Sequence, residues 1–271
     1  PDYYNGMIYL YKYNPDTDTW GTSTSDSMVF TETQKIKPQR FGNEFFGYGG
    51  YHIVMNNLGY LCVSERYYNK ETYRWGSWTP TIYTLNTTTN LWELYTTINV
   101  VNPTPYYWNG TTVPYNVRGY VMNDDYLLVH TAWDFSGIDY DEDGRVGEDW
   151  TGGVYVFKYD STNKNWTQIQ KLLPSKERRA YGAYLGISDW AGAGAIDISE
   201  NNNFIVIGYP RKNTYTGEIL IYNQNTDGTF GNVNSGGSAT EYVETSYIEP
   251  PSHYGMYDYF GFNNLLSGNI L

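Results

Sequence analysis

The chain has 271 residues, an aromatic content of 18% and a formal net charge of −12. This length suits one large domain or two smaller ones, and the acidic balance disfavours binding to nucleic acid phosphates and to anionic membranes. No segment approaches the ~20 consecutive apolar residues that a membrane-spanning helix needs, so we expect no membrane insertion.

An all-β fold is predicted, because short aromatic or β-branched runs alternate with clusters of Gly, Asn, Thr and Pro, and no long run has a helical period. In chain order, the expected strands are 7–13, 27–31, 51–55, 60–64, 81–85, 91–95, 117–122, 126–130, 153–159, 166–171, 195–198, 204–207 and 218–222. Loops are expected at 64–78, 102–114 and 134–150, and a Gly-, Ser- and Asn-rich tail at 228–257.

The cysteine content allows no internal disulfide, because Cys62 is the single cysteine. It lies in the apolar run 60–63, which predicts a buried, inert thiol rather than a nucleophile.

Four polar turns each end on one aromatic residue, and these aromatics are Trp20, Trp92, Trp166 and Phe230. Their spacing is about 70 residues, and each copy contains several short strands. A repeat of this length is typical of a β-propeller or a similar array.

We therefore expect a single β-propeller of about four antiparallel blades. Whole blades are predicted at 41–104, 105–179 and 180–258, with half-blades at 1–40 and 259–271. If the two halves complete one blade in a closed ring, no exposed sheet edge remains. Two alternatives stay open: the halves complete each other between subunits, which generates filaments, or the chain is a piece of a longer propeller.

Three motifs in these repeats resemble the FG-GAP repeat, which builds the integrin α-subunit type of β-propeller. They are Phe-Gly at 41–42 and 260–261, Val-Ile-Gly-Tyr-Pro at 206–210, and Gly-Val-Tyr-Val-Phe at 153–157. The resemblance covers most of the chain, but the second repeat lacks the Phe-Gly opening, and the family usually has seven blades. It implies four strands per blade, in an extracellular or cell-surface protein that acts in binding or adhesion.

The acidic loop 139–149 is the candidate metal site. Asp139, Asp141 and Asp143 alternate before Gly144, which permits a tight turn, and the carbonyl of Arg145 follows. Hard oxygen ligands in a curved loop suit Ca²⁺, and the FG-GAP resemblance also implies Asp-x-Asp-x-Asp-Gly calcium loops. Completing this set requires Glu148 or Asp149. The bound ion would rigidify the loop; the alternative is a solvated acidic loop without metal.

Two aromatic clusters fall in the expected loops and form the candidate ligand-binding surface. Aromatics exposed in loops stack on sugars or anchor protein interfaces, while the alternative is packing between blades. The residues concerned are Tyr68, Tyr73, Trp75, Trp78, Tyr107 and Trp108.

Three glycosylation sequons begin at Asn86, Asn109 and Asn165, all in expected turns or loops. Chance alone produces about this many in a chain so rich in Asn, Ser and Thr. They are therefore acceptor sites only if the chain is secreted.

No signature of catalysis is present, since the three histidines lack metal-ligand spacing and no nucleophile elbow or phosphate loop occurs. We expect a non-enzymatic protein that acts in adhesion or as a structural unit of a surface or filamentous assembly. Its partners would be a protein or glycan ligand, or further copies of itself. Alternatives are a carbohydrate-binding or carbohydrate-active propeller, in which two carboxylates meet in space, and a fragment of a larger integrin-like ligand-binding head.

Overall fold

The computed structural model describes residues 7–17, 19–23, 30–36, 43–44, 53–69, 74–100, 106–108, 111–113, 117–131, 152–175, 196–209, 216–235 and 239–251. Every regular element in these segments is a β-strand, which confirms the all-β prediction. In the same segments, no helix is long and apolar enough to cross a membrane.

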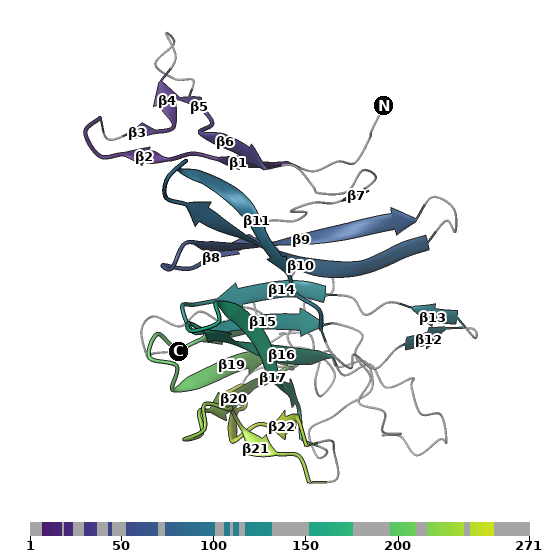
Figure 1. The fold of residues 1–271 in the computed structure, drawn as a ribbon. Coiled ribbons are helices and arrows are strands. Elements are labelled where there is room, and N and C mark those ends of the chain that lie inside the picture. The colour runs from purple at the N-terminus through teal and green to yellow at the C-terminus, as the bar shows by residue number, and fades with distance from the viewer. Residues whose placement is uncertain are drawn as a thin grey trace.

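Four sheets follow one another along the chain (Figure 1). The first pairs β1 (Ile8–Leu10) with β6 (Gln34–Ile36). The second holds β7 (Asn43–Glu44), β8 (Ile53–Met55), β9 (Tyr60–Asn69), β10 (Arg74–Asn86) and β11 (Leu91–Thr97). The third holds β14 (Val117–Met122), β15 (Tyr126–Thr131), β16 (Gly153–Asp160) and β17 (Asn165–Leu173). The fourth holds β18 (Ile196–Ile198), β19 (Phe204–Gly208), β20 (Ile219–Asn223) and β23 (Ser246–Ile248).

Three small hairpins stand apart from these sheets. They are β2 (Tyr13–Asn14) with β3 (Thr19–Trp20), β4 (Thr22–Ser23) with β5 (Phe30–Thr31), and β12 (Tyr106–Trp108) with β13 (Thr111–Val113). The first two hairpins separate β1 from its partner β6 in the sequence.

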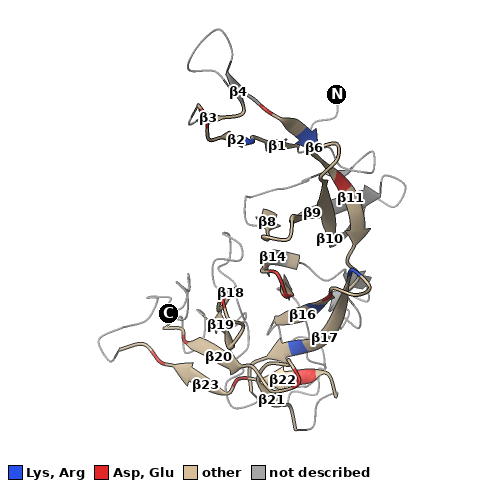
Figure 2. Ribbon diagram, turned by 60° about the vertical axis from the view of Figure 1, so that its left-hand side comes forward, with Lys and Arg blue, Asp and Glu red and all other residues tan. Residues whose placement is uncertain are grey.

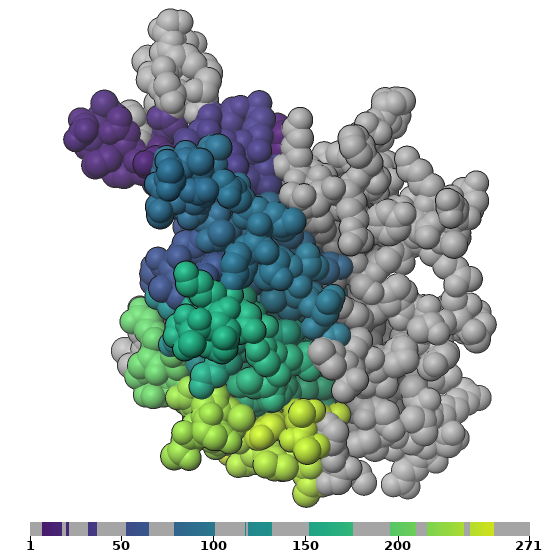
Figure 3. All heavy atoms as spheres, viewed as in Figure 1, coloured from purple at the N-terminus to yellow at the C-terminus, as the bar shows by residue number. Residues whose placement is uncertain are grey.

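The four sheets stack in chain order and follow a curved path (Figures 1 and 2). Figure 3 shows the same order as successive bands of side chains from purple to yellow. The core lies between the sheets, in three apolar clusters, one at each boundary. Strand β15 is covered on both faces, and all six of its residues are buried. Leu127 and Val129 face the second sheet and Leu128 faces the fourth, as the two-residue period of a strand requires.

The turns that close two of the hairpins have the same construction. Asn86 accepts hydrogen bonds from the N–H groups of Thr88 and Thr89 at 2.9 and 3.2 Å. Asp160 accepts from Thr162 and Asn163 at the same two distances. Four residues after each of these caps, Asn90 and Lys164 have positive φ values of 56° and 51°. Local side-chain hydrogen bonds of this kind stabilise tight turns, and they explain the repeated polar segment before each aromatic.

The tail beyond Phe230 joins the third sheet to the fourth. Its strands β21 (Asn232–Val233) and β22 (Glu241–Val243) extend the third sheet, where β22 runs parallel to β17. Strand β23 then pairs with β20 of the fourth sheet. Between them, the Glu244 carboxylate accepts hydrogen bonds from the main-chain N–H of Ser175, at 2.7 Å, and from its hydroxyl. One short segment therefore fastens two neighbouring sheets.

Two expectations about loops were wrong. Residues 64–69 and 74–78 are not loop, because they belong to β9 and β10, which pair as far as Asn69 and Arg74. The region 102–114 contains the β12–β13 hairpin, and the tail contains β21, β22 and β23. Strand pairing between segments overrides the Gly, Tyr and Pro content that marks a loop locally. Cys62 is buried as predicted, and this burial raises the pKa of its thiol.

Candidate functional site

The predicted calcium ligands at 139–149 lie outside the described residues, as do Tyr73, Asn109 and the half-blade at 259–271. Within the described residues, no group of three or more His, Cys, Asp or Glu side chains could hold a metal ion. Calcium binding by the acidic loop therefore stays a prediction.

The predicted aromatic ligand-binding residues other than Tyr73 lie on strands, so their expected loop placement was wrong. Tyr68 is on β9, directly opposite Trp75 on β10, while Trp78 lies further along β10. Tyr107 and Trp108 belong to β12. The role of these aromatic residues in binding a ligand stays a prediction.

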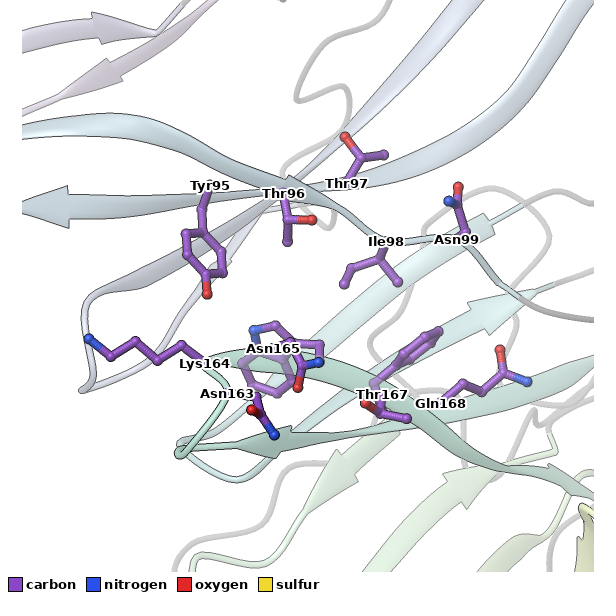
Figure 4. Close-up of a pocket in the computed structure, with 12 residues that line it drawn as sticks. Tyr95, Thr96, Thr97, Ile98, Asn99, Asn163, Lys164, Asn165, Thr167 and Gln168 are labelled. Carbon is purple, nitrogen blue, oxygen red and sulfur yellow. The ribbon is translucent and has the colours of Figure 1, made fainter.

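A groove of about 610 Å³ lies between the second and third sheets. The 12 lining residues come from the end of β11 with the two residues after it, from β16, and from the β16–β17 turn with the start of β17 (Figure 4). They are Tyr95, Thr96, Thr97, Ile98, Asn99, Phe157, Asn163, Lys164, Asn165, Trp166, Thr167 and Gln168.

A β-bulge shapes the β11 side of this groove. The register between β10 and β11 shifts by one residue, so that Ile82 pairs with Thr96 while Tyr83 pairs with Leu94. Tyr95 is the extra residue, and a bulge of this kind re-aims the neighbouring side chains. Figure 4 shows Tyr95 and Thr96 both pointing from β11 toward the turn at 163–165.

Beside the groove, four aromatic rings from both sheets pack together. Tyr60 lies 5.4 Å from Tyr95 and from Tyr159, and 6.2 Å edge-on from Trp166, measured between ring centroids. The hydroxyls of Tyr60 and Tyr159 are hydrogen bonded at 2.8 Å. Burial and this hydrogen bond raise the pKa of Tyr60, so its neutral form is favoured. The indole N–H of Trp166 is buried and has no hydrogen-bond partner among the described residues.

The β16–β17 turn forms the polar rim. Asp160 holds the turn, because its second carboxylate oxygen accepts a hydrogen bond from the Asn163 amide at 2.6 Å. This bond, with the two main-chain N–H groups, lowers the pKa of Asp160. Lys164 and Asn165 are exposed at the rim. The sequon residue Asn165 therefore stands at the groove, whereas the amide of Asn86 donates to the Glu93 carboxylate at 3.0 Å.

One glutamine side chain connects the first sheet to the second, and another connects the third sheet to the fourth. Gln34 donates to the carbonyl of Trp92 at 2.8 Å and accepts from its N–H at 2.7 Å. Gln170 makes the same two bonds to Phe230, both 2.7 Å long. We call this arrangement the glutamine clasp. In both cases the glutamine of one sheet holds the aromatic that ends the turn of the next sheet.

Among the described residues, the boundary that contains the groove lacks this clasp. In β6, Gln34 pairs with Leu10, and in β17, Gln170 pairs with Val156. The corresponding residue of β11 is Thr96, which pairs with Ile82 at the same step beside the bulge. Threonine is too short to reach the next main chain as glutamine does. The groove of about 610 Å³ lies where the clasp is missing, whereas the pocket beside Gln34 and Trp92 measures about 250 Å³.

Thr96, Tyr95 and Lys164 were not predicted as site residues from the sequence. A signal was present, because Thr96 and Gln170 each lie four residues after a repeated tryptophan. The third member of the set, Gln34, follows Trp20 at a longer spacing, since the β4–β5 hairpin intervenes. That insertion conceals the correspondence until the strand registers are known.

Comparison with known proteins shows only distant likeness. No family model matches the chain, and no curated protein matches it. Similar solved structures include a Lactobacillus plantarum protein, which shares 11% identity at a TM-score of 0.43 over 90% of this chain and 52% of that one. The Pseudomonas aeruginosa periplasmic gluconolactonase shares 9% identity at a TM-score of 0.36, over 92% of this chain and 71% of that one.

A Bacteroides thetaiotaomicron endo-1,4-beta-xylanase shares 9% identity at a TM-score of 0.37, over 90% of this chain and 77% of that one. This chain thus spans about half the length of the Lactobacillus protein. These TM-scores are low, and none of the three proteins assigns an activity to this chain.

Proposed function

We propose that this chain is a non-enzymatic protein of the β-propeller type that binds a protein or glycan ligand in the groove between its second and third sheets. The observation that supports the proposal is the groove of about 610 Å³ where Thr96 stands in the position of a clasp glutamine. Its aromatic, amide and lysine side chains suit recognition, because rings stack on ligand surfaces and polar groups fix orientation.

The composition of the groove favours binding over catalysis. None of its 12 lining residues is Asp, Glu, His, Cys or Ser. Glycoside hydrolysis requires a pair of carboxylates, and the lining of the groove provides none. Lys164 is the one lining residue that is cationic at neutral pH. Binding in adhesion, or in a structural surface assembly, fits this lining better than turnover does.

Three further parts of the proposal rest on sequence. The stacked antiparallel sheets are blades of an FG-GAP-like propeller, the protein acts outside the cell or at its surface, and Ca²⁺ rigidifies the loop 139–149. The acidic loop lies outside the described residues, and its test is given in the Discussion.

The experiment compares Tyr95→Ala and Lys164→Ala with wild type on panels of immobilised glycans and extracellular proteins. Tyr247→Ala on β23 and Lys35→Ala on β6 are the matched controls, because both side chains are exposed on sheets that do not border the groove. We expect the groove variants to weaken capture of any ligand that wild type retains, by about tenfold or more, and the controls to keep it. Retention by all four variants would place the ligand elsewhere.

A further inference from the structure

We propose that the groove receives a glutamine side chain from a partner protein, which completes the missing clasp on the main chain of Trp166. This inference rests on the proposed function, because it names the ligand chemistry of the same groove. Two clasps are observed, and at the boundary with the groove no described glutamine makes one.

Trp166 presents the same main-chain groups as the two clasped aromatics. It pairs with Tyr159, one step after the Asp160–Asn165 pair that closes its turn. Trp92 pairs with Leu85, one step after the corresponding pair of Asn86 with Leu91. Because hydrogen-bonded and non-hydrogen-bonded pairs alternate in an antiparallel ladder, the N–H and C=O of Trp166 point away from β16, as those of Trp92 point away from β10.

Trp166 and Thr96 both line the groove, and Thr96 stands at the register position that a glutamine occupies at the other two boundaries. Among the described residues, no side chain hydrogen bonds to the main chain of Trp166, in contrast to Trp92 and Phe230. In the part of the chain that the structure describes, no strand pairs with this edge of β17 at Trp166, since β22 pairs with residues from Lys171 to Leu173. A donor and an acceptor are therefore available to an incoming ligand.

The geometry of the clasp selects the ligand chemistry. A primary carboxamide carries its C=O and an N–H on the same side, so it can donate to a residue's carbonyl and accept from that residue's N–H together. A trans secondary amide, such as the N-acetyl group of a sugar, directs these groups to opposite sides. A carboxylate accepts but cannot donate. Glutamine is the side chain that already performs this function at Trp92 and at Phe230.

The surroundings suit an extended segment of a separate protein. The groove is open to solvent beside the exposed Asn165 and Lys164, and its volume exceeds that of one side chain. Tyr95, which is 36% exposed, lies next to Thr96 and provides an aromatic surface for the aliphatic part of the incoming glutamine.

The test uses hydrogen exchange of the Trp166 main-chain amide, followed by NMR on the full chain. The probes are acetyl-Gly-Gln-Gly peptides with an N-methylamide end, so that glutamine supplies the only primary carboxamide. Matched peptides carry glutamate or alanine in the centre. We expect the glutamine peptide at saturation to slow exchange at Trp166 by about tenfold. Its half-saturating concentration should be about tenfold lower than that of either control peptide, because each control leaves one buried hydrogen bond unmade.

A variant of the protein provides the second arm. Thr96→Gln supplies the carboxamide from the register position that Gln34 and Gln170 occupy. It should slow exchange at Trp166 about tenfold without peptide and remove the effect of the glutamine peptide. Thr96→Glu introduces a side chain as long as glutamine but without the N–H donor. It should neither slow exchange at Trp166 nor remove the effect of the glutamine peptide. Thr96→Ser, which keeps the groove, should respond to the peptide as wild type does.

Each alternative result overturns the proposal in a recognisable way. Equal protection by the alanine and glutamine peptides would indicate strand addition along β17. Protection that grows with protein concentration alone would indicate a second copy of this chain as the occupant. If neither a peptide nor Thr96→Gln slows exchange at Trp166, the proposed clasp on Trp166 is wrong. If the clasp fails but Tyr95→Ala and Lys164→Ala still abolish ligand capture, the proposed function stands without it. If the clasp succeeds while those variants capture normally, the proposed function fails at this groove.

Discussion

Gln34 and Trp92 are 58 residues apart in sequence, yet the glutamine side chain holds the tryptophan main chain by two hydrogen bonds. Gln170 and Phe230, 60 residues apart, repeat this relationship two boundaries later. The two pairs show that successive sheets are joined by specific polar contacts as well as by apolar packing. The stability of the stack should therefore depend on the glutamines, and its binding capacity on the boundary that lacks one.

We expect Gln170→Ala to lower the free energy of unfolding by about 2–6 kcal/mol. Gln170 and Phe230 are both fully buried, so the substitution leaves a buried N–H and a buried C=O without partners, at about 1–3 kcal/mol each. Gln34 is only partly buried, and Gln34→Ala should cost about half as much because water can replace the lost contacts. Denaturant unfolding measures both, and equal losses would show that burial does not set the cost.

Tyr60→Phe should lower the free energy of unfolding by about 1 kcal/mol, the contribution of one hydrogen bond. The lost bond is the 2.8 Å contact between the Tyr60 and Tyr159 hydroxyls. Tyr159→Phe removes the other hydroxyl of the same contact and should cost about as much. Thermal unfolding compares the two, and a Tyr60→Phe protein as stable as wild type would assign the contact no stabilising role.

Alkaline pH should weaken the boundary between the second and third sheets. The pKa of Tyr60 is raised above its ordinary value of 10.0 by burial and by the Tyr159 hydrogen bond. A group whose pKa is raised on folding contributes stability that is fully present below the unfolded pKa. This contribution is lost as pH rises from about 10 toward the folded pKa. Tyrosinate absorbance, measured with and without Tyr60→Phe, should show one late-titrating group that disappears in the variant.

Acidic pH should destabilise the β16–β17 turn, so that stability is lost here as pH falls and not as it rises. The pKa of Asp160 is lowered from its ordinary value of 3.8 by the Asn163 side chain and by two main-chain N–H groups. Its contribution is therefore present above pH 3.8 and is lost as pH falls through the lower folded pKa. The side-chain amide signals of Asn163 should shift toward free values in that range. In Asp160→Asn, these signals should be insensitive to pH.

Calcium should raise the midpoint of thermal unfolding, and chelator should reverse the rise. A ligand present at about 100 times its Kd stabilises the folded state by about 2.7 kcal/mol. Asp141→Asn and Asp143→Asn in the acidic loop should reduce this gain, because each removes a charged oxygen ligand. Asp16→Asn, in the β2–β3 turn, is the control. Calorimetric titration showing no heat in wild type would leave the loop as a solvated acidic segment.

Secretion of the chain from eukaryotic cells should produce glycosylation at Asn165 in preference to Asn86. Asn165 is exposed at the rim, whereas the Asn86 amide is held by Glu93 and its carbonyl by the turn. Peptide mapping by mass spectrometry measures both occupancies. A glycan on Asn165 would also cover the groove, so that Asn165→Gln should bind ligand more tightly than the glycosylated wild type. Equal occupancy at both sites would show that the turn does not protect Asn86.

Much of the local structure could be predicted from residue chemistry. The apolar runs around Leu127, Val156 and Val206 became strands, and the turns begin at the expected Asn and Asp residues. The segments expected to be loops were predicted less well than the strands. Tyr68, Trp75 and Trp78 lie on two long paired strands, because a neighbouring strand satisfied their main chains where local composition indicated a loop.

The sequence by itself determined the all-β class, the recurring turn that ends on an aromatic, and the burial of Cys62, because each depends on residues close together in the chain. Only the tertiary structure decided which boundaries carry a glutamine clasp and which one holds a groove. That outcome depends on strand register and on a bulge that places Thr96 opposite Ile82. The partners Gln34 and Trp92 meet only when two sheets pack, so no local pattern contains their hydrogen bonds.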